Sequence, residues 1–133
     1  MKSITLRTHG RCELVDITGE VQKAIQECGL ENGLAMVFVP HTTAGVTINE
    51  NADPSVVADL LENLERLVPQ HGNYRHSEGN SDAHCKASLV GSSVSVAVQT
   101  GKLVLGTWQG IYFCEFDGPR SRKFHVLALP GVS

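Results

Sequence analysis

The chain has 133 residues, of which 41% are hydrophobic and 19% charged, and its formal net charge is −3 at pH 7. This length is that of a single domain, and the composition excludes collagen-like, coiled-coil and disordered proteins. The small negative charge provides no general attraction for nucleic acid or for an anionic membrane surface. We therefore expect one globular domain over residues 1–133, with neither nucleic acid nor membrane as a partner.

The cysteines and the first residues of the chain indicate a reducing compartment. No two of the four cysteines have the CxxC spacing of a metal or redox pair. The N-terminal residues are too polar for the apolar segment of a secretory signal, and no apolar run is long enough to cross a bilayer. We expect reduced thiols and a cytoplasmic location.

Two strands and a helix are predicted first along the chain. The strands are ITLRT at 4–8 and CELVDIT at 12–18. In the helix that follows, Thr18 is the candidate N-cap and Gly29 the residue that ends it. Apolar residues recur there at helical spacing, at Val21, Ala24, Ile25 and Cys28.

Two further strands, at 34–41 and 45–50, precede a second helix. Asp53 is the candidate cap of this helix, Pro54 takes its first position and Pro69 stops it. One apolar stripe runs along the helix, at Val57, Leu60, Leu61, Leu64 and Val68.

The last part of the chain is predicted to be strands. They cover 93–98, 102–106, 107–116 and 123–129. Thr100–Gly101 makes a hairpin turn and Asp117-Gly118-Pro119 turns the chain before the last strand. Short turns between neighbouring strands indicate antiparallel pairing. The predicted fold class is α+β: a bent, mostly antiparallel sheet, as an open barrel or sandwich, packed with two main helices.

Residues 70–83, QHGNYRHSEGNSDA, are predicted to form one long polar loop. A loop of this length in a compact domain is usually either functional or disordered. Its content of His, Glu, Asn and Asp favours a functional loop.

Three of the six histidines are candidates for chemistry. His41 ends a predicted strand, His76 lies in the polar loop and His84 follows it. An imidazole can ligate a metal, act as a general base or bind an anion, and it titrates near neutral pH. Asp82 or Glu78 would orient a ring nitrogen. The spacing matches no short zinc motif, so the residues alone leave metal, catalytic and plain surface roles open.

Three other features carry candidate residues. Glu50 ends a strand just before the second helix, where it would hold a cation or an amino group, or simply be solvated. The concentrated basic patch consists of Arg120, Arg122 and Lys123, and arginine suits phosphate recognition. Trp108, between two glycines, would stack on a ring or fill a core or subunit interface.

Three blocks of sequence carry a resemblance to a known family. They are HTTAGVTINENADPSVVADL, YRHSEGNSDAHCKASLVGSS and GKLVLGTWQGIYFCEFDGPRSRK. Together they resemble the YjbQ family, also called UPF0047, over nearly the whole chain. The resemblance implies a bent antiparallel sheet and a homotrimer. It also implies, from some members, a secondary thiamine-phosphate synthase activity, which joins a hydroxymethylpyrimidine diphosphate to a thiazole phosphate and releases pyrophosphate, normally with Mg²⁺.

The resemblance places candidate residues on this chain. As a transferase, the protein would have a phosphorylated small molecule as substrate, with His76 and His84 binding phosphate or moving protons, Arg120 binding diphosphate and Glu50 holding Mg²⁺ or the aminopyrimidine. The catalytic candidates are His84, His76, Asp82 and Glu50. The substrate-binding candidates are Thr42, Thr43, Asn49, Asn80, Trp108 and Arg120.

Two alternatives to the transferase remain open. The first is a metal-dependent hydrolase with His41, His76 and His84 as ligands of Zn²⁺ or another transition metal and a bound water as nucleophile. The second is a non-enzymatic trimer that binds a small molecule without turnover.

Overall fold

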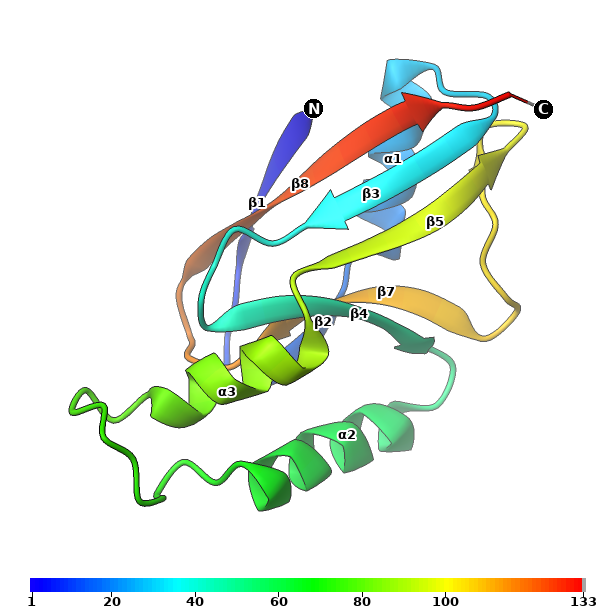
Figure 1. The fold of residues 1–133 in the computed structure, drawn as a ribbon. Helices are drawn as coiled ribbons and strands as arrows, with labels where there is room; N and C mark the ends of the chain where they lie inside the picture. The colour runs from blue at the N-terminus through cyan, green and yellow to red at the C-terminus, as the bar shows by residue number, and fades with distance from the viewer. Residues whose placement is uncertain (133) are drawn as a thin grey trace.

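The computed structural model describes residues 1–132, which form three helices and eight strands (Figure 1). In chain order these elements are β1 (Lys2–Arg7), β2 (Glu13–Asp16), α1 (Thr18–Cys28), β3 (Gly33–Phe38), β4 (Ala44–Glu50), α2 (Pro54–Leu67), α3 (Ser81–Val90), β5 (Ser93–Gln99), β6 (Lys102–Leu103), β7 (Gln109–Glu115) and β8 (Ser121–Pro130). The predicted α+β class is confirmed. Within residues 1–132 no helix is long and apolar enough to span a membrane.

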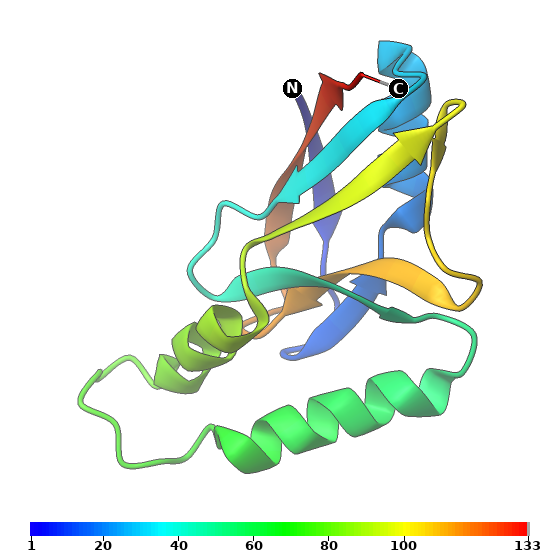
Figure 2. The ribbon, with the colours of Figure 1, turned by 45° about the vertical axis from the view of Figure 1, so that its right-hand side comes forward.

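The strands form two antiparallel sheets. The five-stranded sheet has the order β1-β8-β3-β5-β6, and the three-stranded sheet has the order β2-β7-β4. Figures 1 and 2 show α1 packed against the five-stranded sheet, whereas α2 and α3 lie on the far side of the three-stranded sheet. Thr100 and Gly101, with φ of 51° and 75°, form the predicted hairpin turn between β5 and β6.

The three-stranded sheet is covered on both faces, because side chains along β7 alternate between two apolar clusters. Ile111 and Phe113 belong to the main core, which α1 and both sheets share. Tyr112 and Cys114 belong to a second cluster with residues of α3. The fold therefore places α3, and the pocket described below, on the outer face of β7 and β4.

The first two helices follow their local sequence signals closely. Gly29, at φ 73°, ends α1 as predicted, but Thr18 is the first residue of the helix and Ile17 is its N-cap. The Thr18 hydroxyl instead accepts the N–H of Ile111 at 2.8 Å and so ties α1 to β7. In α2, the Asp53 carboxylate accepts the N–H of Ser55 at 2.9 Å, as a capping residue does.

A third helix corrects the prediction of two main helices and of a polar loop over 70–83. Residues 81–83 are the first turn of α3, and the connection from α2 is shorter than predicted. The predicted strand at 107–116 is also too long, since Thr107 and Trp108 lie in the turn before β7.

Candidate functional site

A pocket of about 470 Å³ lies between the turn that follows β3 and the outer side of α3. The close approach of α3 to β4 beside the pocket requires glycine at position 45, since a Cβ there would lie 2.5 Å from the carbonyl oxygen of Gly91. The Val46 N–H donates to the same oxygen at 3.0 Å, which fixes the end of α3 on β4. The residues that line the pocket are His41, Thr42, Ala44, His84, Ala87, Ser88, Gly91 and Ser92.

His41 is held at the edge of this pocket by the backbone of β8. Its Nε2 lies 3.1 Å from the backbone nitrogen and 3.0 Å from the carbonyl oxygen of Lys123. The edge of the ring packs on Phe113. Burial, followed by the nearby guanidinium of Arg122, lowers the pKa of His41 from its ordinary value of 6.5. The lowered pKa favours the neutral form of the imidazole.

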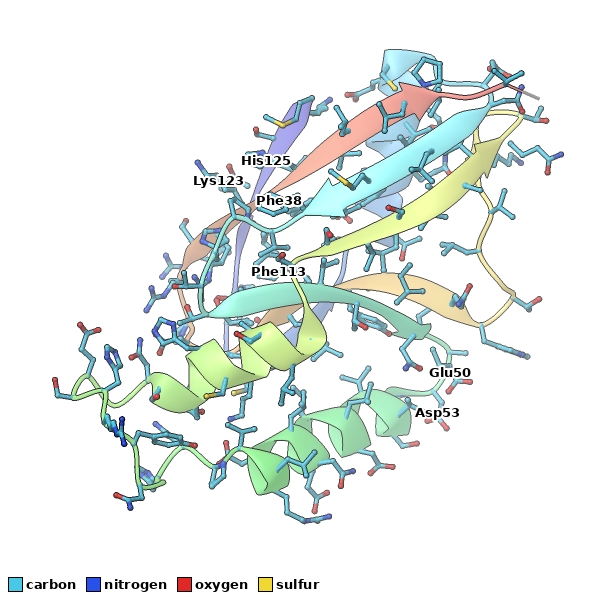
Figure 3. All side chains as sticks on the ribbon, viewed as in Figure 1. Phe38, Glu50, Asp53, Phe113, Lys123 and His125 are labelled. Carbon is cyan, nitrogen blue, oxygen red and sulfur yellow. The ribbon has the colours of Figure 1, made fainter. Side chains whose placement is uncertain are left out.

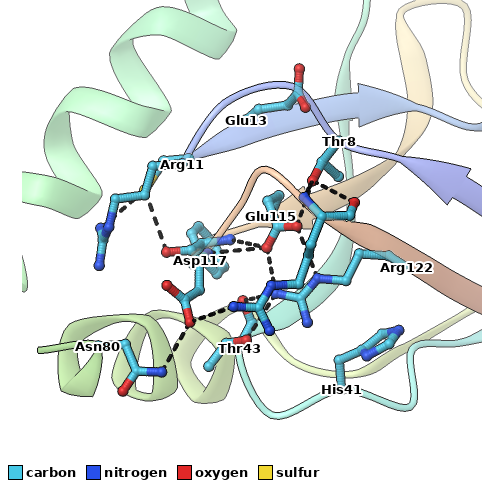
Figure 4. A network of polar contacts seen from close by, with 12 residues as sticks. Thr8, Arg11, Glu13, His41, Thr43, Asn80, Glu115, Asp117 and Arg122 are labelled. Atoms are coloured by element: carbon cyan, nitrogen blue, oxygen red, sulfur yellow. Dashed lines mark hydrogen bonds and ion pairs between the residues drawn. The ribbon is translucent and has the colours of Figure 1, made fainter. Parts of the chain in front are cut away.

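A buried ion pair supports the turn that carries His41 (Figure 4). Arg122 donates to both oxygens of Glu115, at 2.9 and 2.5 Å, and to the Thr43 hydroxyl at 2.8 Å. The Thr8 hydroxyl donates to the same carboxylate at 2.7 Å. Burial alone would raise the pKa of Glu115, but the hydrogen bonds from Arg122 hold it below 4.5. Thr43, a predicted substrate-binding residue, thus has its hydroxyl engaged inside the protein.

Asp117 brings together two of the predicted substrate-binding residues. Its Oδ2 accepts from Nδ2 of Asn80 at 2.9 Å and from Nη2 of Arg120 at 3.2 Å (Figure 4). The Asn80 Oδ1 is buried without a hydrogen-bond partner among residues 1–132. The Arg120 side chain is half exposed.

The three candidate histidines lie near one another but do not form a complete set of ligands for one metal ion. His41 and His84 line the same pocket, and the rings of His76 and His84 lie 5.4 Å apart, centroid to centroid. Nε2 of His76 lies 3.6 Å from the carboxylate of Glu78. Across residues 1–132, no three His, Cys, Asp or Glu side chains are grouped so that they could hold a metal ion.

The structure gives Asp82 partners other than the expected histidine ring. Its side chain is fully buried and accepts two hydrogen bonds from Arg11, at 3.1 and 2.9 Å, and one from Lys86 at 2.7 Å. Burial disfavours its ionised form, but these hydrogen bonds bring its pKa below the ordinary value. Asp82 therefore anchors the first turn of α3 to the loop that carries Arg11.

The remaining candidates lie at the opposite end of the three-stranded sheet. Glu50 is the last residue of β4 and lies near Asp53, whereas His41 precedes the start of that strand (Figure 3). The carbonyl oxygen of Trp108 accepts the Asn51 N–H at 2.9 Å, and the Trp108 side chain is 62% exposed. A strand of seven residues spans roughly 20 Å. Within one chain, Asn49, Glu50 and Trp108 are therefore separate from the pocket.

Comparison with known proteins decides the family. A family model described as "UPF0047 protein YjbQ-like" matches residues 2–130. The chain belongs to the YjbQ family.

Relatives and solved structures of YjbQ proteins cover almost the whole chain. The UPF0047 protein MJ1081 of Methanocaldococcus jannaschii is 56% identical, with 91% of this chain and 88% of the relative covered. YugU of Bacillus subtilis is 52% identical, with 95% and 96% covered. A crystal structure of an uncharacterised YjbQ/UPF0047 family protein from Clostridium acetobutylicum has a TM-score of 0.96 at 55% identity, covering 97% of this chain and all of the other.

In this YjbQ protein, sequence reasoning missed three residues of the polar network. Thr8 binds Glu115 and Arg11 binds Asp82 from loops remote in sequence, whereas Lys86 binds Asp82 within α3. One local signal was present, since Asp82 and Lys86 have the i,i+4 spacing of a helical ion pair. For Thr8 and Arg11 the sequence carries no such signal.

Proposed function

We propose that this YjbQ protein is a thiamine-phosphate-synthase-type transferase and that its substrates bind at the pocket between His41 and His84. The observation that carries the proposal is this pair of imidazoles in one pocket, together with the hydroxyl-bearing residues Thr42, Ser88 and Ser92. The N–H groups of imidazoles and the hydroxyls of Ser and Thr donate hydrogen bonds to phosphate oxygens.

The chemistry of the reaction matches such a lining. The thiazole nitrogen donates its lone pair to the methylene carbon of the pyrimidine, and the C–O bond to the diphosphate breaks with its electron pair going to the leaving oxygen. The protein has to stabilise this departing negative charge. In the proposal, His41 and His84 donate hydrogen bonds to it, and the half-exposed Arg120 near the start of α3 neutralises it.

A resident Mg²⁺ fits this pocket poorly. No carboxylate belongs to its lining, and the carboxylates of Asp82, Glu115 and Asp117 are all paired with basic side chains. Mg²⁺ is commonly bound through substrate phosphates and few protein ligands. We therefore assign no protein-held magnesium site and keep Mg²⁺ as a companion of the diphosphate substrate.

The direct test is an assay with the purified protein, the pyrimidine diphosphate, the thiazole phosphate and Mg²⁺. We expect thiamine phosphate and pyrophosphate in equal amounts. His84→Ala should lower kcat/KM by about 10²-fold or more, whereas His9→Ala, an exposed residue that does not line the pocket, should leave it unchanged. Absence of product from folded wild-type protein would reject the transferase.

The contact between His76 and His84 favours a second candidate, the histidine-ligated metal-dependent hydrolase. His41 lies in the pocket that His84 lines, and in this candidate the three rings move together to bind the ion. Elemental analysis of untagged protein tests this candidate. Near-stoichiometric zinc or another transition metal that disappears in His84→Ala supports it, and metal-free active protein rejects it.

The setting we propose for either activity is a cytoplasmic homotrimer that acts on a phosphorylated small molecule and uses neither nucleic acid nor membrane as a partner. The four cysteines are unpaired in residues 1–132, as in a reducing compartment. Leu34, Phe38 and Leu129 expose 36%, 40% and 44% of their surface on strands of the five-stranded sheet, which supports contact between copies.

A non-enzymatic binding protein would give a different result in the assay. The thiazole phosphate would then raise the thermal stability of the folded protein without any turnover.

A further inference from the structure

The helix α2 covers the three-stranded sheet without being built into it. None of its residues, all of which are described, is buried, although the helix has 14 residues. Only Val57 and Leu64 pack against the second apolar cluster, and Leu67 is 75% exposed. By contrast, the shorter α1 buries Val21, Ala24 and Ile25. Figure 2 shows α2 lying apart from the strands, below α3 and the sheet.

One ion pair joins α2 to α3. The Lys86 ammonium donates to Oε1 of Glu65 on α2 and to Asp82 on α3, at 2.7 Å in both cases. The other oxygen of Glu65 accepts the N–H of Gln70 at 2.7 Å. Arg11 completes a row of alternating charges through Asp82. A single carboxylate thus connects the end of α2, the segment after it and α3.

The energetics of this contact keep the free-energy cost of opening small. Lys86 is only 1% exposed, and the charge it pairs with on α2 is half exposed. Buried ion pairs contribute little net stability because their attraction is offset by lost hydration. If α2 leaves, Lys86 regains water and keeps Asp82 as its partner. Regions with few buried apolar contacts open at a lower free energy than the whole domain.

We propose that α2 and the connection 68–79 form an arm that opens from the three-stranded sheet, with the Glu65–Lys86 ion pair as its latch. The connection carries His76, so opening separates this ring from His84 and enlarges access to α3. A helix of this length is marginal without tertiary contacts, so the released arm melts and its amides exchange with solvent.

Hydrogen exchange followed by mass spectrometry on the native assembly tests the arm. In the wild type, we expect amides across 54–67 to exchange together, and at least tenfold faster than those of β7 at the centre of its sheet. Glu65→Gln should accelerate exchange in 54–67 by about a further tenfold, with β7 unchanged. The matched control is Glu62→Gln, which breaks the exposed pair with Arg66 and should change the rate by less than about threefold.

Three results would overturn the proposal. The first is protection of α2 in the wild type as strong as that of β7, which would make the helix part of the global folding unit. The second is equal exchange in Glu65→Gln and Glu62→Gln, which would remove the latch. The third is protection of 54–67 that rises with protein concentration, which would show that another copy covers the helix.

Discussion

Glu115 links three separate parts of the chain through one carboxylate. It accepts hydrogen bonds from Thr8, Arg122 and the backbone N–H groups of Phe116 and Asp117. Both charged side chains of the pair with Arg122 are at most 4% exposed. The carboxylate therefore compensates a guanidinium that has almost no water around it.

Replacing Glu115 by Gln should lower the free energy of unfolding by about 3–5 kcal/mol, because it leaves the Arg122 charge buried and unpaired. Urea unfolding at pH 7 measures this loss. Glu62→Gln, which breaks an exposed ion pair, serves as the control and should cost less than about 1 kcal/mol. A loss in Glu115→Gln no larger than in the control would contradict the assigned role.

The same carboxylates predict how stability depends on pH. The folded-state pKa values of Glu115 and Asp82 lie below their ordinary values of 4.5 and 3.8. A depressed pKa contributes stability that is fully present above the ordinary value and is lost as the pH falls through the folded value. We expect the free energy of unfolding to fall gently below about pH 6.5, where His41 is protonated more readily in the unfolded chain, and to fall more steeply below about pH 5 as the carboxylates are protonated. In Glu115→Gln the fall should be shallower, and an equal slope in urea titrations would refute the assignment.

At the scale of the elements, Gly45 controls how closely α3 approaches β4. A Cβ at this position would lie 2.5 Å from the Gly91 carbonyl oxygen, so Gly45→Ala should push the helix away at a cost of about 1–3 kcal/mol. Gly19 in α1 has open space around it, and Gly19→Ala should stabilise the protein by about 0.5–1 kcal/mol. Thermal unfolding of the two variants tests both expectations, and equal changes in Tm relative to the wild type would contradict them.

The elements also show how far the sequence predicts this fold. The start of α2 follows from two local signals, because the Asp53 carboxylate caps the helix and Pro54 takes its first position. The helix α3 lacks a side-chain cap, and its apolar stripe consists only of the small residues Ala83 and Ala87 with Val90. Its buried residues include Asp82 and Lys86, whose burial depends on Arg11 and Glu65. When charged residues are buried only through partners elsewhere in the chain, their segment cannot be distinguished from a polar loop by its sequence alone.

The candidate site shows the same limit. His41 and His84 were recognisable by residue type, but their shared pocket depends on the contact between Gly45 and Gly91. Glu50 is separated from His41 and His84 by the length of β4. This separation depends on how the strand lies in its sheet, which the sequence does not show. Residue chemistry was thus predictable, while the grouping of residues depended on long-range packing.

For the whole molecule, the exposed apolar side chains of the five-stranded sheet predict assembly. We expect sedimentation equilibrium to give three times the 14.3 kDa mass of one chain. Leu129→Lys should shift the population toward monomer, because it places a charge among the exposed apolar side chains of β3 and β8. A control substitution, Leu67→Lys on the outer side of α2, should leave the mass unchanged. A monomeric wild type would reject the assembly.

The position of β8 within its sheet has a consequence for biosynthesis. This strand, the last one described, lies between β1 and β3, so it joins the start of the chain to the rest of the sheet. While residues 121–130 are still inside the ribosome, β1 has no neighbour and an apolar edge of β3 stays open. We expect the nascent chain to complete this sheet only after residues 121–130 have left the ribosome, and to need protection from aggregation until then.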